Sequence, residues 1–146
     1  MWNKNLVFGL SPEAAAGLLL RLALGLLFFL AGLGKFAGPG GPVGAAQGIA
    51  DMFQPTFLPR ILVVPFAYLL PYVEISLGAL LILGVFTLEA FAVAGVMLIS
   101  LAMGMAVQGK HDVVAHNLNY VLITAVGLWF TSKDNRFALD TRFRKK

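Results

Sequence analysis

Long apolar runs separated by short polar breaks dominate the chain. A transmembrane helix needs about 20 apolar residues to cross a hydrocarbon core of about 30 Å. Four runs reach that length: Ala14 to Phe36, Ile61 to Phe86, Leu88 to Val107 and Asp112 to Thr131. The alternating ten-residue pattern of a membrane β-barrel is not found. Because backbone groups in lipid must be satisfied within the chain, the pattern predicts an all-α integral membrane four-helix bundle in a single domain.

Composition supports this interpretation and removes several alternatives. The 146 residues are 59% hydrophobic and 12% charged, whereas soluble domains are about 45–50% apolar and about 25% charged. A chain this short cannot bury so much apolar surface in water, so a soluble globular domain and a disordered chain are both excluded. The absence of cysteine excludes disulfides, thiolate chemistry and iron–sulfur ligation by the chain.

Helix ends are marked by capping residues and by glycine and proline. The segment Ser11-Pro12-Glu13 supplies an N-cap, a proline at the first helical position and an acid in the first turn. Residues 38–42, with the sequence GPGGP, end the first span. Between the second and third spans there is room only for a tight turn, in which we expect Thr87 to cap the third helix.

The one long connection, Ala37 to Arg60, is rich in glycine and proline. Two structures fit it equally well. One is an irregular loop, and the other is a short amphipathic helix that lies at the interface and covers the bundle. The apolar face of that helix would consist of Val43, Ala46, Ile49, Ala50 and Phe53.

Basic residues in the flanks predict the orientation in the membrane. With four spans, the two termini lie on one side with the basic tail, residues 132–146. That side carries seven basic residues: Lys4, Lys133, Arg136, Arg142, Arg144, Lys145 and Lys146. The other side carries three: Lys35, Arg60 and Lys110. The positive-inside rule therefore places both termini in the cytoplasm, the long connection outside it and the chain in the cell membrane. The net charge of +4 is a topology signal, and no nucleic-acid partner is expected.

Small and polar residues form stripes on the predicted helices, as expected for faces that point into a bundle. On the first span they are Gly17, Arg21, Gly25, Phe28, Gly32 and Lys35. On the second span Glu74 lies near the centre, where an unpaired charge costs about 2.5–3.5 kcal/mol or more. We therefore expect Arg21 to pair with Glu74. The pair either fixes helix register or supplies a carboxylate that handles protons, and the sequence favours neither role.

Histidines and aromatic residues offer weaker candidates. His111 and His116 are five residues apart, about 140° around a helix, so they cannot share a ligand. Asp112 and His116 lack a third strong ligand on their face, so we expect neither a metal nor haem. A hydrated helix entrance or a head-group contact for a quinone or lipid explains these residues better. Tyr72 together with Phe28 could form the wall of a flat apolar pocket.

The spacing of these residues resembles the DoxX/DoxD family of small membrane proteins. Three segments carry the resemblance: Arg21-xxx-Gly25-xx-Phe28-xxx-Gly32-xx-Lys35, Pro71-xx-Glu74-xxx-Gly78-xxxxx-Gly84-xx-Thr87, and the tail from Asp134 to Asp140. Two positions depart from the family pattern: Leu88 stands where many relatives have Arg, and Ala138 where Ser is usual. The resemblance covers nearly the whole chain and implies four helices in the cytoplasmic membrane.

The resemblance also implies a redox-linked role, since some family members are subunits of a thiosulfate:quinone oxidoreductase and others associate with redox-stress enzymes. We therefore expect a subunit of a quinone-linked oxidoreductase that works with a soluble or membrane redox partner. Its quinone would lie between the first, second and fourth spans. Glu74 would handle the proton and Arg21 would tune it. The residues expected around the quinone are Phe28, Tyr72, His116, Asn119 and Lys35.

Other functions remain open from the sequence. The main alternative is a non-enzymatic membrane scaffold or assembly factor in which the Arg21–Glu74 pair is structural. A small-solute carrier is disfavoured because the chain has no internal repeat and no pair of interrupted helices. The glycine stripe of the first span also fits a homodimer interface.

Overall fold

The computed structural model describes residues 6–7, 9–133, 135 and 138–139. This part of the chain forms five helices: α1 (Pro12–Ala37), α2 (Gly41–Met52), α3 (Arg60–Leu83), α4 (Thr87–Val107) and α5 (His111–Lys133). All except α2 are long and apolar enough to cross a membrane. The predicted all-α architecture with four candidate membrane spans is confirmed.

Local sequence accounts for most helix ends. At the start of α1, the Ser11 hydroxyl accepts a hydrogen bond from the backbone N–H of Ala14 at 3.2 Å, and Pro12 is the first helical residue, as predicted. The capping role predicted for Thr87 is wrong. Phe86, at φ 48°, is the residue that precedes α4, and Thr87 is already helical. Gly84, at φ 69°, ends α3, so a turn of three residues separates the two helices.

The long connection contains a helix, which decides between the two structures open from the sequence. Gly40 adopts φ 73° and lets the chain turn from α1 into α2. Ala46 and Ala50 of the expected apolar face are buried, and Ile49 and Phe53 are partly buried. Val43, also expected on that face, is 50% exposed. The helix packs mainly on α3 and also contacts α1.

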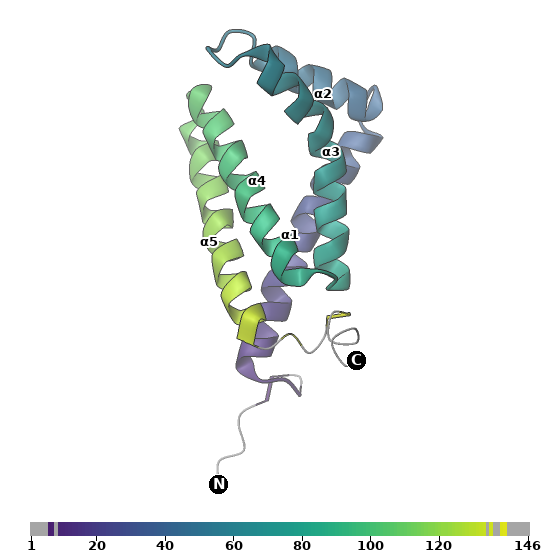
Figure 1. The fold of residues 1–146 in the computed structure, drawn as a ribbon, viewed down its shortest axis with the longest axis vertical. Coiled ribbons are helices and arrows are strands. Elements are labelled where there is room, and N and C mark those ends of the chain that lie inside the picture. The colour runs from purple at the N-terminus through teal and green to yellow at the C-terminus, as the bar shows by residue number, and fades with distance from the viewer. Residues whose placement is uncertain (1–5, 8, 134, 136–137, 140–146) are drawn as a thin grey trace.

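The long helices form two antiparallel pairs, α1 with α3 and α4 with α5 (Figure 1). The pairs meet where α1 also packs on α5. There Gly17, near the start of α1, closely approaches Thr131, near the end of α5. From their tight turn, α3 and α4 spread apart toward the end that carries α2 (Figure 1). The bundle is therefore closed at one end and spread at the other.

Glycines set the close contact between α1 and α3. A Cβ added to Gly32 would lie 2.7 Å from the backbone N of Ile75, and one added to Gly78 would collide with the backbone of Phe29. Such small residues let membrane helices approach closely. The glycine stripe of the first span is thus used within the chain, against α3 and α5.

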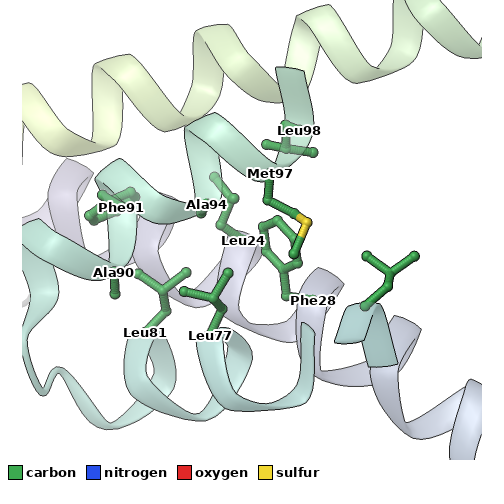
Figure 2. Packing of buried hydrophobic residues seen from close by; sticks show 10 residues of the cluster. Leu24, Phe28, Leu77, Leu81, Ala90, Phe91, Ala94, Met97 and Leu98 are labelled. Atoms are coloured by element: carbon green, nitrogen blue, oxygen red, sulfur yellow. The ribbon is translucent and has the colours of Figure 1, made fainter. Parts of the chain in front are cut away.

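The apolar core lies where the two helix pairs meet (Figure 2). Leu24 and Phe28 come from α1, Leu77 and Leu81 from α3, and Phe91 from α4. Phe91 is fully buried and fills the space that Gly127 of α5 leaves open, since a Cβ there would lie 2.6 Å from its ring. This core joins both pairs below the spread end of the bundle.

Candidate functional site

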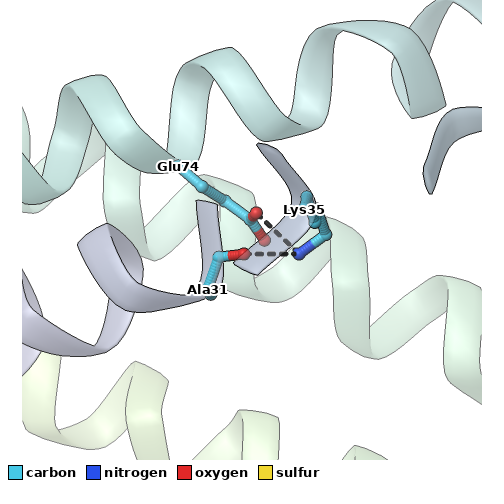
Figure 3. A network of polar contacts seen from close by, with 3 residues as sticks. All are labelled: Ala31, Lys35 and Glu74. Carbon is cyan, nitrogen blue, oxygen red and sulfur yellow. Dashed lines mark hydrogen bonds and ion pairs between the residues drawn. The ribbon is translucent and has the colours of Figure 1, made fainter. Parts of the chain in front are cut away.

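An ion pair joins α1 to α3 near the spread end of the bundle (Figure 3). Lys35 Nζ donates a hydrogen bond to Glu74 Oε2 at 2.7 Å and a longer one to the carbonyl oxygen of Ala31 at 3.5 Å. The side chain of Glu74 is 5% exposed and that of Lys35 is 25% exposed. Gly32, one turn before Lys35, lets α3 approach closely enough for the lysine to reach the carboxylate. A nearly buried carboxylate is thus neutralised by a lysine that retains some access to its surroundings.

The predicted pairing of Arg21 with Glu74 is wrong. Arg21 and Lys35 are 14 positions apart on α1, about 21 Å at 1.5 Å per residue. In the antiparallel packing of α1 and α3, Arg21 lies beside Gly84, whereas Glu74 lies beside Lys35. The polar stripes correctly predicted which helix faces meet. They did not predict how far one helix is shifted along the other, because both basic residues lie on the same stripe.

Arg21 instead belongs to a polar cluster at the closed end of the bundle. It is 4% exposed, and its Nη1 donates a hydrogen bond to Asn135 Oδ1 at 3.3 Å. Asn135 Nδ2 donates in turn to the hydroxyl of the fully buried Thr87 at 3.2 Å. A Cβ on Gly84 would lie 2.5 Å from Arg21 Nη1 and 2.7 Å from the Cα of Ala138. This cluster ties the segment after α5 to α1 and α4.

The cluster changes the interpretation of the predicted tail motif and of Arg21. Asn135 and Ala138 of the motif lie against the turn between α3 and α4. Asp134, Asp140 and residues 136–137 of the motif lie outside the described residues. Arg21 is level with the ends of α3 and α5 and far from the ion pair, so a role in tuning Glu74 by direct contact has no support.

A cavity of about 300 Å³ opens beside the ion pair. Its polar lining consists of Lys35, Glu74, Ser100 and Asn117, and the remaining walls are apolar. The apolar walls come from all helices except α1: Ile49 and Met52 of α2, Phe53 just after it, Phe66 and Leu70 of α3, Leu101, Gly104 and Met105 of α4, and Val113 of α5. This is the composition of a site for a small, mostly apolar molecule with a polar group.

The structure brings together two of the predicted site residues, Lys35 and Glu74, and places the others elsewhere. Phe28 is 3% exposed in the core. Tyr72 is 51% exposed and packs edge-on against Phe36, with ring centroids 5.2 Å apart. His116 and Asn119 are exposed on α5 and are not part of the cavity lining. The wall expected from Phe28 and Tyr72 is therefore not formed.

Several lining residues escaped the sequence analysis. Asn117 of α5 faces the cavity in place of the expected His116 and Asn119. Ser100 and Gly104 belong to the third span, which was expected to lie outside the site, yet they line the cavity. Their spacing of four, with small side chains on one helical face, was a usable signal. Phe53 follows the short helix α2, whose existence the sequence left open.

Comparison with known proteins identifies the family. The sequence model of the family described as "Methylamine utilisation protein MauE" matches residues 13–130, which include the ion pair and the lining of the cavity. No curated protein and no solved structure matches the chain. The predicted resemblance holds at the coarser level, because MauE is a DoxX-like membrane protein family, although the match is not to DoxX by name. The chain therefore belongs to the MauE family of multi-pass membrane proteins.

Proposed function

We propose that the cavity beside Lys35 and Glu74 binds the head group of a quinone, and that the chain is the membrane subunit of a quinone-linked oxidoreductase. One observation carries the proposal: an ion pair lines a cavity of about 300 Å³ whose other walls are mostly apolar. Small-molecule sites typically have volumes of about 300–1,000 Å³, with few polar groups that fix the orientation of the ligand.

The residues of the cavity fit a quinone. A quinone ring is flat and apolar and carries carbonyl oxygens that accept hydrogen bonds. The Lys35 ammonium and the Asn117 amide are donors in the lining, and Phe53 and Phe66 supply aromatic walls. A bound quinone would supply two-electron, two-proton redox chemistry. Lys35 would orient a carbonyl group, Glu74 would hold or deliver a proton at its carboxylate, and the apolar walls would exclude water.

The chain requires a partner for this role. It contains no cysteine and so offers no thiol that could pass electrons to a quinone. In this proposal a partner subunit that holds the electron carrier supplies the electrons. The family description refers to methylamine utilisation, and we place the proposed subunit in that process. The flanking charges favour termini in the cytoplasm and a cavity in the outer half of the membrane.

The test is quinone binding by the purified protein in lipid nanodiscs. A short-chain ubiquinone or menaquinone analogue should bind the wild-type chain, and Glu74→Gln and Lys35→Met should each weaken binding at least about tenfold, equivalent to 1.4 kcal/mol. Tyr72→Phe is the matched control, because Tyr72 lies on α3 near Glu74 in sequence but outside the cavity lining. The proposal fails if folded wild-type protein carries no quinone and binds neither analogue.

The second candidate is a non-enzymatic scaffold or assembly factor in methylamine utilisation. The observation that favours it is that the polar contacts also join elements of the fold. Lys35–Glu74 connects α1 to α3, and Asn135 connects α1 to α4. In this role Glu74→Gln should lower the stability of the chain and its capture of a partner protein in the same proportion, and the wild-type chain should bind no quinone. A quinone subunit predicts instead that the folded fraction of Glu74→Gln protein loses quinone binding by more than its loss of stability explains.

A further inference from the structure

A second cavity, of about 360 Å³, adjoins the first where α3 and α4 spread apart. It is lined by Ile49 of α2, the segment after α2, the first two turns of α3 and the last turns of α4. Ser100 is the only residue of its lining with a polar side chain. This cavity is therefore an apolar groove, and we refer to it as the α3–α4 groove.

The α3–α4 groove shares part of its lining with the cavity beside Lys35 and Glu74. Five residues line both: Ile49, Phe53, Phe66, Ser100 and Gly104. At this boundary Gly104 has no side chain where the Phe53 ring approaches, since a Cβ there would lie 3.1 Å from Phe53 Cζ. The two cavities together form one path, which starts at Lys35 and Glu74 and becomes wholly apolar beyond Ser100.

The far end of the groove opens to the outside of the bundle. Leu62 of α3 and Met103 of α4 line it and are 64% and 67% exposed. Both helices are candidate membrane spans, and they diverge at this end (Figure 1). Apolar side chains exposed on a membrane span face lipid, so the groove opens sideways into the bilayer.

We infer that the α3–α4 groove holds the isoprenoid tail of a quinone whose head group lies at Lys35 and Glu74. This inference rests on the function proposed above and names the ligand class more closely: a long-tailed quinone that enters from the bilayer. Along the path the surroundings change from charged to apolar and then to lipid. A long-tailed quinone has the matching order, with a polar head group followed by a long apolar tail. Moving the tail from lipid into the groove gains no hydrophobic free energy, because both surroundings are apolar. Any preference of the tail for the groove must therefore come from packing contacts with its walls.

The test compares two ubiquinone analogues, with one and with four isoprene units, in nanodiscs of fixed phosphatidylcholine and phosphatidylglycerol content. Affinity is expressed per mole fraction in lipid, so that partitioning into the bilayer does not contribute. We expect the longer analogue to bind about tenfold more tightly, a difference of 1.4 kcal/mol. Met103→Trp should fill the groove and abolish that difference, while the short analogue keeps its affinity.

Val96→Trp is the matched control variant. Val96 lies two turns from Met103 on the same face of α4, is 65% exposed, and lines neither cavity. This variant should retain the full preference for the longer tail. It also shows whether an exposed tryptophan on α4 is tolerated by the fold.

Three outcomes overturn the inference, and they are distinguishable. If both analogues bind equally well, the groove does not select isoprenoid tails, although the proposed head-group site stands. If Met103→Trp and Val96→Trp behave alike, the preference arises outside the groove. If neither analogue binds, the proposed function and this inference fall together.

Discussion

The ion pair between Lys35 and Glu74 should contribute measurably to stability, because the Glu74 carboxylate is nearly buried. The perturbation is Lys35→Met, which removes the ammonium group and keeps most of the apolar stem. The two charged atoms are 2.7 Å apart, and the Glu74 side chain is 5% exposed. Removing one partner of a buried pair costs about 3–5 kcal/mol, whereas exposed pairs contribute about 0.2–1 kcal/mol.

The exposure of Lys35 sets the expected magnitude. Its side chain is 25% exposed, so the surroundings partly screen the charges and the cost should fall at the low end, at about 3 kcal/mol. The double variant Lys35→Met/Glu74→Gln leaves no buried charge without a partner. It should recover about 2 kcal/mol of the loss, since neutral replacements of a buried pair are often tolerated. The coupling energy between the two positions should therefore exceed about 1.5 kcal/mol.

The assay is reversible unfolding in mixed micelles by titration with sodium dodecyl sulfate, followed by circular dichroism. Lys110→Met is the control, because it removes an exposed lysine whose ammonium donates a long hydrogen bond to the sulfur of Met52, at 3.8 Å. It should change the free energy of unfolding by less than about 0.5 kcal/mol. A coupling energy of about 0.2–1 kcal/mol would refute the reasoning, because it would mean that solvent screens Glu74 as it does a surface carboxylate.

Three further predictions concern the fold and its orientation. Gly32→Ala should be about 1–3 kcal/mol less stable than Gly34→Ala in the same unfolding assay. Of the two positions, only Gly32 would bring the new Cβ against the facing helix, so equal stabilities would contradict this packing. Asn135→Ala should lower the free energy of unfolding by about 1–3 kcal/mol, since it removes the hydrogen bonds to the buried Arg21 and Thr87, whereas Ser132→Ala on the exposed surface should not. Single-cysteine variants of this cysteine-free chain test its orientation in the membrane. In intact cells an impermeant maleimide should label Gln54→Cys and not Ser132→Cys. The reverse labelling pattern would show the opposite orientation.

The sequence was sufficient for the membrane class, the four candidate spans and the start of the first helix. Apolar runs of about 20 residues can be satisfied in lipid only as helices, so length and hydropathy leave little choice. Ser11 and Pro12 act through neighbouring backbone atoms, and local chemistry predicts such contacts well. Glu74 was also identified correctly as a charge that needs a partner, because its position near the centre of an apolar run is visible in one dimension.

The tertiary structure decided which residues meet. Arg21 and Lys35 lie on one stripe of α1, and only the shift between α1 and α3, set where Gly32 and Gly78 allow the backbones to touch, assigns Lys35 to Glu74. The cavity likewise depends on how far α3 and α4 diverge. Periodicity along one helix contains no information on its displacement along another. The composition of each helix face was thus determined by the sequence, and the partners of each charge were determined by packing.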